Sequence, residues 1–271
     1  MVITATVIAQ SSQAALMTPF QAKHCGSLPF KPSLTASTTG KTSKANGASL
    51  VVQVTQNPGE ANIHKVSLTL PLALPARLTT LQKACTEAQF NTNPAGCPEG
   101  SNIGTATAHT PLLNSPLTGP AYLVSHGGAA FPDVEFILQG EGVEIVLDGK
   151  TDIKKGITYS KFETVPDAPI TNFQTTLPQG PHSALAANAN LCTTTKTITT
   201  KKRVTIHHHN GHTTHILRTI KKQTPVPPLL TPTTITAQNG ATLTQNTKIT
   251  ITNCPKKAKP THTKHKTHKK T

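Results

Sequence analysis

The sequence predicts an all-β protein: an antiparallel Ig-like β-sandwich that carries an inserted β-hairpin and ends in a disordered basic tail. Two observations favour this fold class. Short β-branched or alternating runs recur through the first two thirds of the chain, which is the pattern of strands with one buried face. The 22 prolines and 17 glycines are spread among these runs and punctuate them as turns do in all-β domains.

Four segments have the clearest strand pattern, with turn residues near their ends: 50–55, 65–70, 133–138 and 143–147. Asp148-Gly149 predicts a hairpin turn directly after the last of them. Residues 76–90 lack strand alternation and predict a short helix that leads into a loop at Cys85. Because aromatic residues make up only 3% of the chain and Trp is absent, the core must be built from Val, Ile, Leu and Ala.

Residues 193–230 are predicted to form a Thr/His/Lys-rich hairpin, which we call the insert, and residues 255–271 form a basic disordered tail. The insert and the tail are therefore expected to lie outside the sandwich.

The N-terminal segment shows a short internal match. Residues 8–25 run parallel, with small gaps, to residues 236–254, and both stretches end in a cysteine. We therefore expect residues 1–25 to be the closing hairpin of a preceding repeat, in a chain that is the C-terminal portion of a larger repeat protein. Chance similarity is the alternative.

The five cysteines show no metal-binding spacing. Cys85 and Cys97 bracket a short loop with a turn before the second cysteine, so they predict one disulfide, and Cys192 with Cys254 predicts a second. Cys25 is left without a partner. Disulfides favour an extracellular or cell-surface location, against the alternative of simple buried thiols.

The net charge of +15 is confined to the end of the chain. Residues 1–192 carry 11 basic and 11 acidic residues, whereas residues 193–271 carry 15 basic residues and no acid. This asymmetry predicts contact with an anionic wall polymer or lipid surface, and the alternative is that the charge only keeps a Thr-rich segment soluble. The lack of aromatic residues in the basic region disfavours nucleic acid. No apolar run is long enough for a transmembrane segment.

The insert contains a possible metal site. An Asn210-Gly211 turn of type I′ would pair residue 209 with 212 and residue 207 with 214. His207, His209 and His212 would then share one face, where they could bind zinc, nickel or copper. The alternative is a solvated hairpin whose histidines only add charge.

The sequence contains no complete catalytic motif, and it predicts a non-enzymatic protein without a cofactor. Ser125-His126-Gly127-Gly128 resembles an esterase oxyanion segment, but no Gly-x-Ser-x-Gly nucleophile accompanies it. Six acids lack the spacing of a calcium loop, and a solvated strand face explains them better: Asp133, Glu135, Glu141, Glu144, Asp148 and Asp152.

Five stretches are specific when they occur together in this order: LPFKP at 28–32, GKTSKANGA at 40–48, LTTLQKAC at 78–85, LTGPAYLVSHGGAAFP at 117–132 and LPQGPHSALAAN at 177–188. Through them, residues 28–192 and 231–254 resemble the last repeat of large, uncharacterised actinobacterial secreted or cell-surface repeat proteins. The resemblance implies export and cysteine-closed β repeats, and it assigns no catalytic residue. It also implies that the repeat unit comprises residues 26–192 plus 231–254, with residues 193–230 inserted into it. The insert departs from the family pattern, so the resemblance gives it no function.

Three classes of function follow. The first is a secreted or cell-envelope structural or adhesive protein whose basic C-terminal region contacts an anionic polymer or lipid. The second is a β-sandwich module that binds a lipid or glycan ligand. A secreted hydrolase is the third and the least favoured.

Overall fold

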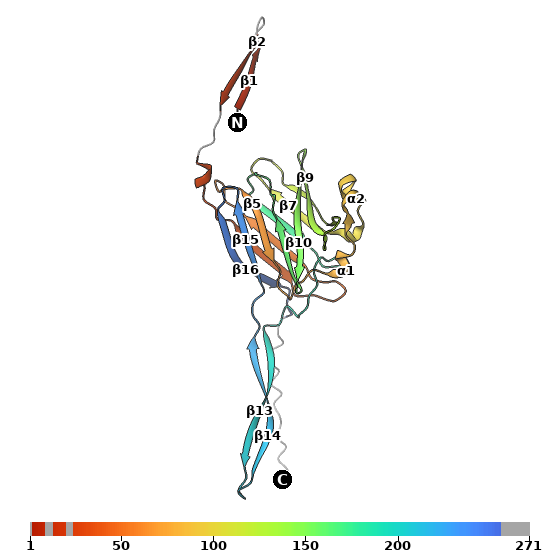
Figure 1. Cartoon of the computed structure of the whole chain (residues 1–271), viewed down its shortest axis with the longest axis vertical. Helices are drawn as coiled ribbons and strands as arrows, with labels where there is room; N and C mark the ends of the chain where they lie inside the picture. The colour runs from red at the N-terminus through yellow and green to blue at the C-terminus, as the bar shows by residue number, and fades with distance from the viewer. Residues whose placement is uncertain (1, 9–12, 20–23, 256–271) are drawn as a thin grey trace, which may run out of the picture.

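The structure is a computed structural model that describes residues 2–8, 13–19 and 24–255 (Figure 1). These residues contain sixteen strands, two short α-helices and three 3₁₀ turns. The all-β class predicted from the sequence is confirmed. The predicted disordered tail at 255–271 falls almost entirely outside the described residues and stays a prediction.

Eleven strands are hydrogen-bonded into one closed, barrel-like sheet. Around the sheet they follow the order β8 (Leu117–Ser125), β7 (Asn102–His109), β12 (Asn172–Leu177), β4 (Leu50–Thr55), β3 (Ser33–Thr39), β16 (Thr242–Thr252), β15 (Leu230–Ala237), β5 (Ile63–Thr69), β11 (Ile157–Phe162), β10 (Val143–Lys154) and β9 (Asp133–Gly140). The last strand, β9, pairs again with β8 and closes the ring.

Ten of the eleven strand pairs are antiparallel, and the pair of β3 with β16 is parallel. A ring with an odd number of strands cannot alternate direction throughout, so at least one neighbouring pair must run the same way. That pair joins the first and the last strand of the closed sheet.

The single closed sheet differs from the predicted Ig-like sandwich, in which two separate sheets pack face to face. Strand alternation does not distinguish the two architectures, because each buries one face of every strand. The difference lies in the edges. Here β8 bonds to both β7 and β9, and β3 bonds to both β4 and β16. The β8–β9 and β3–β16 pairings therefore remove the edges that a sandwich would keep.

The hairpin turn predicted at Asp148-Gly149 is wrong. These two residues lie in the middle of the long strand β10. The turns on either side of β10 instead contain Glu141-Gly142, with φ of 49° and 77°, and Lys155-Gly156, with φ of 52° and 76°. Gly149 has a packing role, since a Cβ there would collide with the ring of Phe162.

A short helical segment covers the outside of the sheet next to β8. It contains α1 (Leu78–Leu81), the two-residue strand β6 (Cys85–Thr86), which pairs with β8, and α2 (Glu87–Thr92). The single helix predicted over 76–90 is thus two helices separated by a strand. Three 3₁₀ turns are η1 (Cys25–Ser27), η2 (Pro94–Gly96) and η3 (Glu99–Ser101). We call residues 78–101 the flap, and its contact with the sheet buries a small second core: Cys85, Phe90, Tyr122, Val124 and Ile137.

Both predicted disulfides are confirmed. Cys85 and Cys97 close the flap, with Cα atoms 5.4 Å apart, and Cys192 is bonded to Cys254 with a Cα separation of 5.5 Å. Gly40, just after β3, lies so close to the second bridge that a Cβ there would collide with the Cys192 sulfur. Cys25 is a free, exposed thiol.

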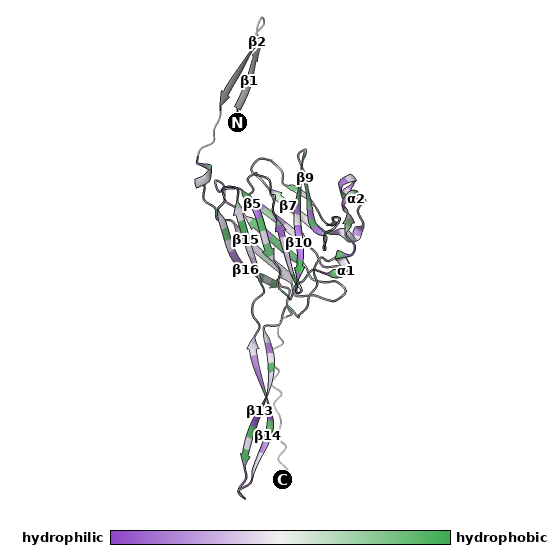
Figure 2. Cartoon of the chain, in the orientation of Figure 1, coloured by the Kyte–Doolittle hydropathy of each residue, from purple (hydrophilic) through white to green (hydrophobic). Residues whose placement is uncertain are grey.

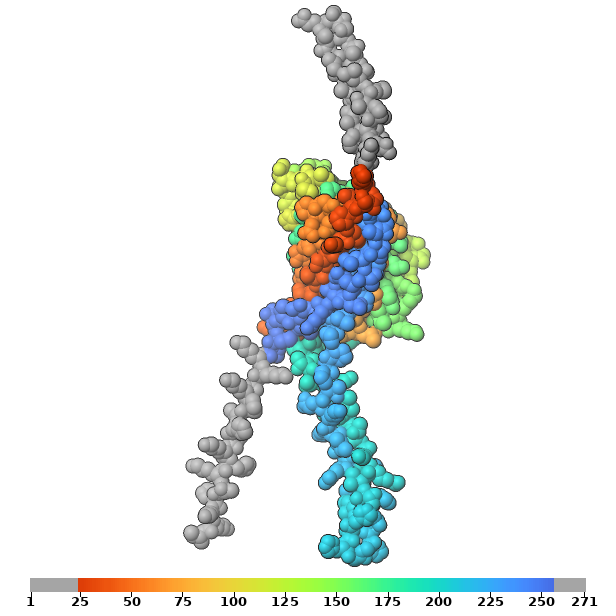
Figure 3. All heavy atoms as spheres, turned by 90° about the vertical axis from the view of Figure 1, so that its left-hand side faces the viewer, coloured from red at the N-terminus to blue at the C-terminus, as the bar shows by residue number. Residues whose placement is uncertain are grey.

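The insert forms a long two-stranded ribbon of β13 (Thr195–His207) and β14 (Thr213–Pro225). Within the described part of the chain these strands pair only with each other, as do β1 (Val2–Ile8) and β2 (Gln13–Pro19). The Val226 N–H donates to the Thr194 carbonyl at 2.9 Å and ties the base of the ribbon together. Figures 1 and 3 show the ribbon projecting away from the closed sheet as a narrow arm.

Candidate functional site

The interior of the closed sheet contains an apolar cavity of about 360 Å³. Aliphatic side chains from strands all around the ring line it, among them Leu50, Ile63 and Leu123. Phe136 lies at its wall with Phe162 stacked at 5.6 Å and Phe173 edge-on at 5.7 Å. The volume is that of a small-molecule pocket, and apolar cavities of this kind exclude water and accept apolar ligands.

The cavity follows from strand number and composition together. The interior of an eight-stranded barrel is just wide enough for side chains to fill, and the diameter grows with each added strand. Eleven strands therefore enclose more space than Val, Ile, Leu and Ala can occupy. The chain has no Trp and only 3% aromatic residues, so few large side chains are available to fill that space.

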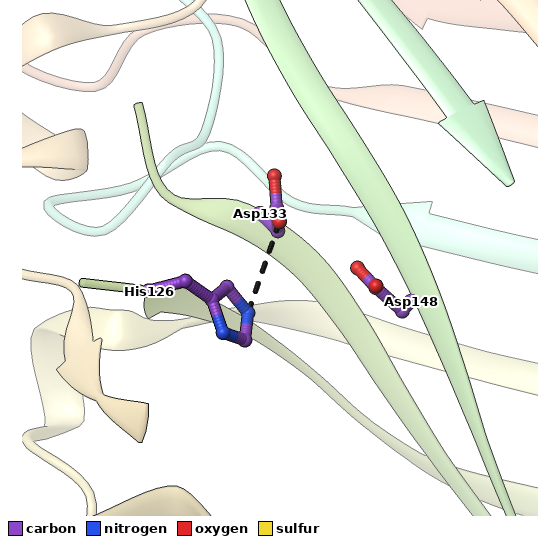
Figure 4. A group of neighbouring side chains, drawn as sticks. All are labelled: His126, Asp133 and Asp148. Carbon is purple, nitrogen blue, oxygen red and sulfur yellow. Dashed lines mark ion pairs between the residues drawn. The ribbon is translucent and has the colours of Figure 1, made fainter. Parts of the chain in front are cut away.

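A second candidate site lies on the outer face of the sheet, where β8, β9 and β10 meet the flap. Asp133 and Glu135 are two residues apart on β9 and share this face, and Asp148 and Lys150 do the same on β10. Glu135 pairs directly with Asp148 across the two strands. His126 follows the end of β8 and points toward Asp133 (Figure 4). We call these five residues the acid–histidine cluster.

The cluster is densely connected. The Nε2 atom of His126 lies 2.9 Å from Glu135 Oε1 and 3.8 Å from Asp133 Oδ2. The ammonium of Lys150 lies between two carboxylates, 3.1 Å from Asp133 Oδ2 and 3.0 Å from Asp148 Oδ2. Asp133 also accepts a hydrogen bond from the Thr151 backbone N–H at 2.9 Å. The position of Asp133 is therefore fixed from two sides.

The pKa values of the cluster reflect burial and crowded charge. Burial lowers the pKa of His126, but hydrogen bonding to Glu87 and the charges of Glu135 and Asp133 outweigh burial and raise it above 6.5. Burial raises the pKa of Glu135 above 4.5, and the protonated His126 opposes that rise. Hydrogen bonds to Asp148 and then to Asp133 raise the pKa of Lys150.

The sequence did not predict this cluster. Asp133 and Glu135 were expected on a solvated strand face, yet only 3% and 5% of these residues is exposed. That expectation is wrong for both, because His126 contacts both carboxylates and Lys150 contacts Asp133. It holds for Glu144, which is exposed on β10, whereas Glu141 is exposed in the turn between β9 and β10. Within the described ranges, only one set of three His, Cys, Asp or Glu side chains brings its possible metal-ligand atoms within 4.8 Å of one another: His126, Asp133 and Asp148.

The histidines of the ribbon do not meet as predicted. His207 pairs with Thr213 rather than with residue 214, so the register is shifted by one residue. The reason is the turn: only Gly211 has positive φ, at 82°, whereas a type I′ turn also requires it at Asn210. The Gly211 N–H instead donates to the His208 carbonyl, and the loop contains one more residue than predicted. His207 and His212 consequently lie on opposite faces, and His209 lies in the loop.

The observed register gives the ribbon two different faces. One face carries five β-branched aliphatic side chains, which alternate with four cations: Ile198, Val204, Ile206, Ile216 and Ile220 with Lys196, Lys202, Arg218 and Lys222. The opposite face is mainly Thr, Gln and His, with Lys201, Arg203, Lys221 and one aliphatic residue, Leu217. Figure 2 shows hydrophobic and hydrophilic residues interspersed along both strands. We call the first of these the aliphatic face.

The disulfides indicate a non-cytoplasmic protein, because such bonds persist in oxidising compartments. None of the helices in the described residues has the length and apolar character that a membrane crossing requires. Comparisons with known protein families, with curated proteins and with solved structures found no match.

Proposed function

We propose that this chain is a non-enzymatic secreted or cell-envelope protein that attaches to an anionic surface through its ribbon. The observation that carries the proposal is the ribbon itself, a projecting arm with seven Lys and Arg residues and no acid. The proposal agrees with the resemblance of the sequence to secreted or cell-surface repeat proteins.

Electrostatics favours the ribbon as the contact surface. The acids and bases of residues 1–192 cancel, so the long-range field of the molecule comes from the basic C-terminal region. Clustered cations attract polyanions and anionic lipids within about one Debye length, and each Lys or Arg near an anionic membrane contributes about 1 kcal/mol. A ribbon that projects from the body can bring its cations to a surface without a clash with the closed sheet.

The aliphatic face favours a lipid surface over a wall polymer. Ile206, Ile216 and Ile220 are exposed to 37%, 41% and 41%, and nothing in the described chain covers them. Apolar side chains interspersed with cations match the membrane interface, where the former enter the acyl boundary and the latter meet headgroups. A wall polymer would satisfy the cations and leave these side chains in water.

Vesicle binding tests the proposal. The full chain is expected to bind phosphatidylcholine vesicles that contain phosphatidylglycerol, and to release them as salt shortens the screening length from ~10 Å at 0.1 M to ~3 Å at 1 M. Replacing Ile206 and Ile216 with Thr should weaken this binding about tenfold and leave retention on polyphosphate resin unchanged. Leu217→Thr, on the other face, is the matched control and should bind like the parent.

Two outcomes would contradict the proposal. Equal binding by the parent and by a variant with Lys196, Lys202, Arg218 and Lys222 changed to Gln would exclude the ribbon as the contact. Binding to polyphosphate resin without binding to vesicles would favour the wall polymer as the partner.

The internal cavity supports a second candidate function, the binding of an apolar ligand such as a lipid acyl chain. The test is titration with a fluorescent fatty acid. Ala108 lines the cavity and is 6% exposed, so Ala108→Phe should fill the space and abolish binding while the circular dichroism spectrum stays unchanged. Undiminished binding by this variant would place the fatty acid outside the cavity.

A further inference from the structure

We propose that the acid–histidine cluster binds a divalent transition-metal cation, such as Zn²⁺, through His126, Asp133 and Asp148 in place of the Lys150 ammonium. Glu135 is the fourth ligand. This site is separate from the ribbon and from the cavity, and it does not depend on the function proposed for either.

The charge balance of the cluster points to a cation. Four carboxylates converge here, Glu87, Asp133, Glu135 and Asp148, and the side chains of Asp133 and Glu135 are only 5% and 7% exposed. Lys150 supplies one positive charge and a protonated His126 a second, so the carboxylates are in excess. Buried carboxylates are costly unless they are paired or coordinate a metal ion. A divalent cation supplies the missing charge.

The spacing of the donor atoms fits a small cation. Ligands about 2.0–2.1 Å from a tetrahedral zinc ion are roughly 3.3 Å apart. His126 Nε2 lies 2.9 Å from Glu135 Oε1 and 3.8 Å from Asp133 Oδ2, on either side of that value. Figure 4 shows His126 and Asp148 approaching Asp133 from neighbouring segments. Small side-chain rotations would bring all four groups to coordination distance.

The histidine ring is already oriented for metal binding. Its other nitrogen, Nδ1, lies 3.3 Å from Glu87 Oε1 at the start of α2. A carboxylate on the remote nitrogen is the usual support of a metal-bound imidazole, because it fixes the ring and increases the basicity of the ligating nitrogen. The flap supplies this support, and the Cys85–Cys97 bridge holds the flap on the sheet.

Lys150 marks the cation position and is free to leave it. Its Nζ atom contacts the Oδ2 atoms of both Asp133 and Asp148, while 55% of its side chain is exposed. The ammonium can therefore swing into solvent when a metal ion enters. The buried Oδ1 atom of Asp148 has no hydrogen-bond partner and offers a further unsatisfied oxygen to the ion.

Zinc titration of the full chain distinguishes a metal site from a network of ion pairs. Asp148→Asn should weaken zinc affinity tenfold or more, because it removes a charged ligand. Lys150→Met should tighten it about fivefold, because the competing cation is gone. Lys154→Met is the matched control on the same strand. Its amine pairs with Asp152 outside the cluster, and zinc affinity should stay unchanged.

Cobalt absorption separates this site from the histidines of the ribbon. A visible d–d band of tetrahedral Co²⁺ should persist when His207, His209 and His212 are changed to Gln, and should disappear in His126→Gln. The proposal is overturned if Asp148→Asn binds zinc like the parent, if Lys150→Met fails to tighten binding, or if the band depends on the ribbon histidines instead. Circular dichroism of each variant confirms that a lost band is not lost folding.

Discussion

Replacing Cys192 and Cys254 with Ala is expected to lower the free energy of unfolding by about 4.3 kcal/mol. The bridge closes a ring across a sequence separation of 62 residues, and it stabilises the fold by restricting the unfolded chain. Cys85 and Cys97 close a ring across a separation of only 12 residues, for which the same relation gives about 2.8 kcal/mol. The longer ring should therefore contribute about 1.5 kcal/mol more than the shorter one.

Urea unfolding followed by far-ultraviolet circular dichroism measures both values. All variants should carry Cys25→Ser, because the exposed thiol could otherwise exchange with the remaining bridge. A loss below about 1 kcal/mol for the Cys192–Cys254 pair, or a larger loss for the Cys85–Cys97 pair, would refute the argument from ring size. The first result would mean that the unfolded chain already holds these segments together.

Two further predictions concern the β8–β9 side of the sheet. In the folded protein the pKa of His126 lies above 6.5 and that of Glu135 above 4.5, the ordinary values that apply to the unfolded chain. Each group therefore contributes its full stabilisation below its unfolded-state pKa, and this contribution is lost as pH rises through its folded-state pKa. Urea unfolding should show stability falling with pH in these windows, and His126→Gln should remove the fall above 6.5. Gly119→Ala should cost about 1–3 kcal/mol, because its Cβ would collide with the Ile137 carbonyl at the β8–β9 pairing. Gly127→Ala is the control, with nothing within 4 Å of the added atom, and equal thermal midpoints for the two variants would contradict the reasoning.

Sequence patterns predicted the features that depend on local chemistry. Residues 50–55 are strand β4, and the predicted strands at 133–138 and 143–147 lie in β9 and β10. These segments alternate or are β-branched, which is enough to indicate a strand whatever its partners are. The cysteine pairs could be predicted because a turn precedes Cys97 and because no metal spacing competes.

Closure of the sheet could not be predicted, because pairing depends on contacts between distant strands. The parallel bond between β3 and β16 joins residues more than two hundred positions apart. No local pattern encodes such a partner, and a sandwich and a closed sheet place the same residues inward.

The candidate metal site was missed because of one misplaced turn. A turn at Asp148-Gly149 separates Asp148 from Glu135, whereas the observed turn at Glu141-Gly142 pairs them across β9 and β10. In the ribbon, the predicted register was wrong by one residue. It placed three histidines on one face that the observed register separates. In a hairpin the turn fixes the register, and the register decides which side chains can share a ligand.

The parallel pair also determines how the chain passes through the closed sheet. β3 and β16 run side by side in the same direction, with Ala36 opposite Ile249 and Thr39 opposite Thr252. The start of β3 therefore lies at one end of the sheet, and the end of β16 lies at the other (Figure 1). An antiparallel pair at this position would have brought entry and exit to the same end, and successive units would then fold back on one another. With entry and exit at opposite ends, units joined in tandem extend in a line, which supports the proposal of a surface repeat protein. The ribbon leaves the sheet at the exit end, beside the Cys192–Cys254 bridge, so in such a line it would project from the junction that follows the unit.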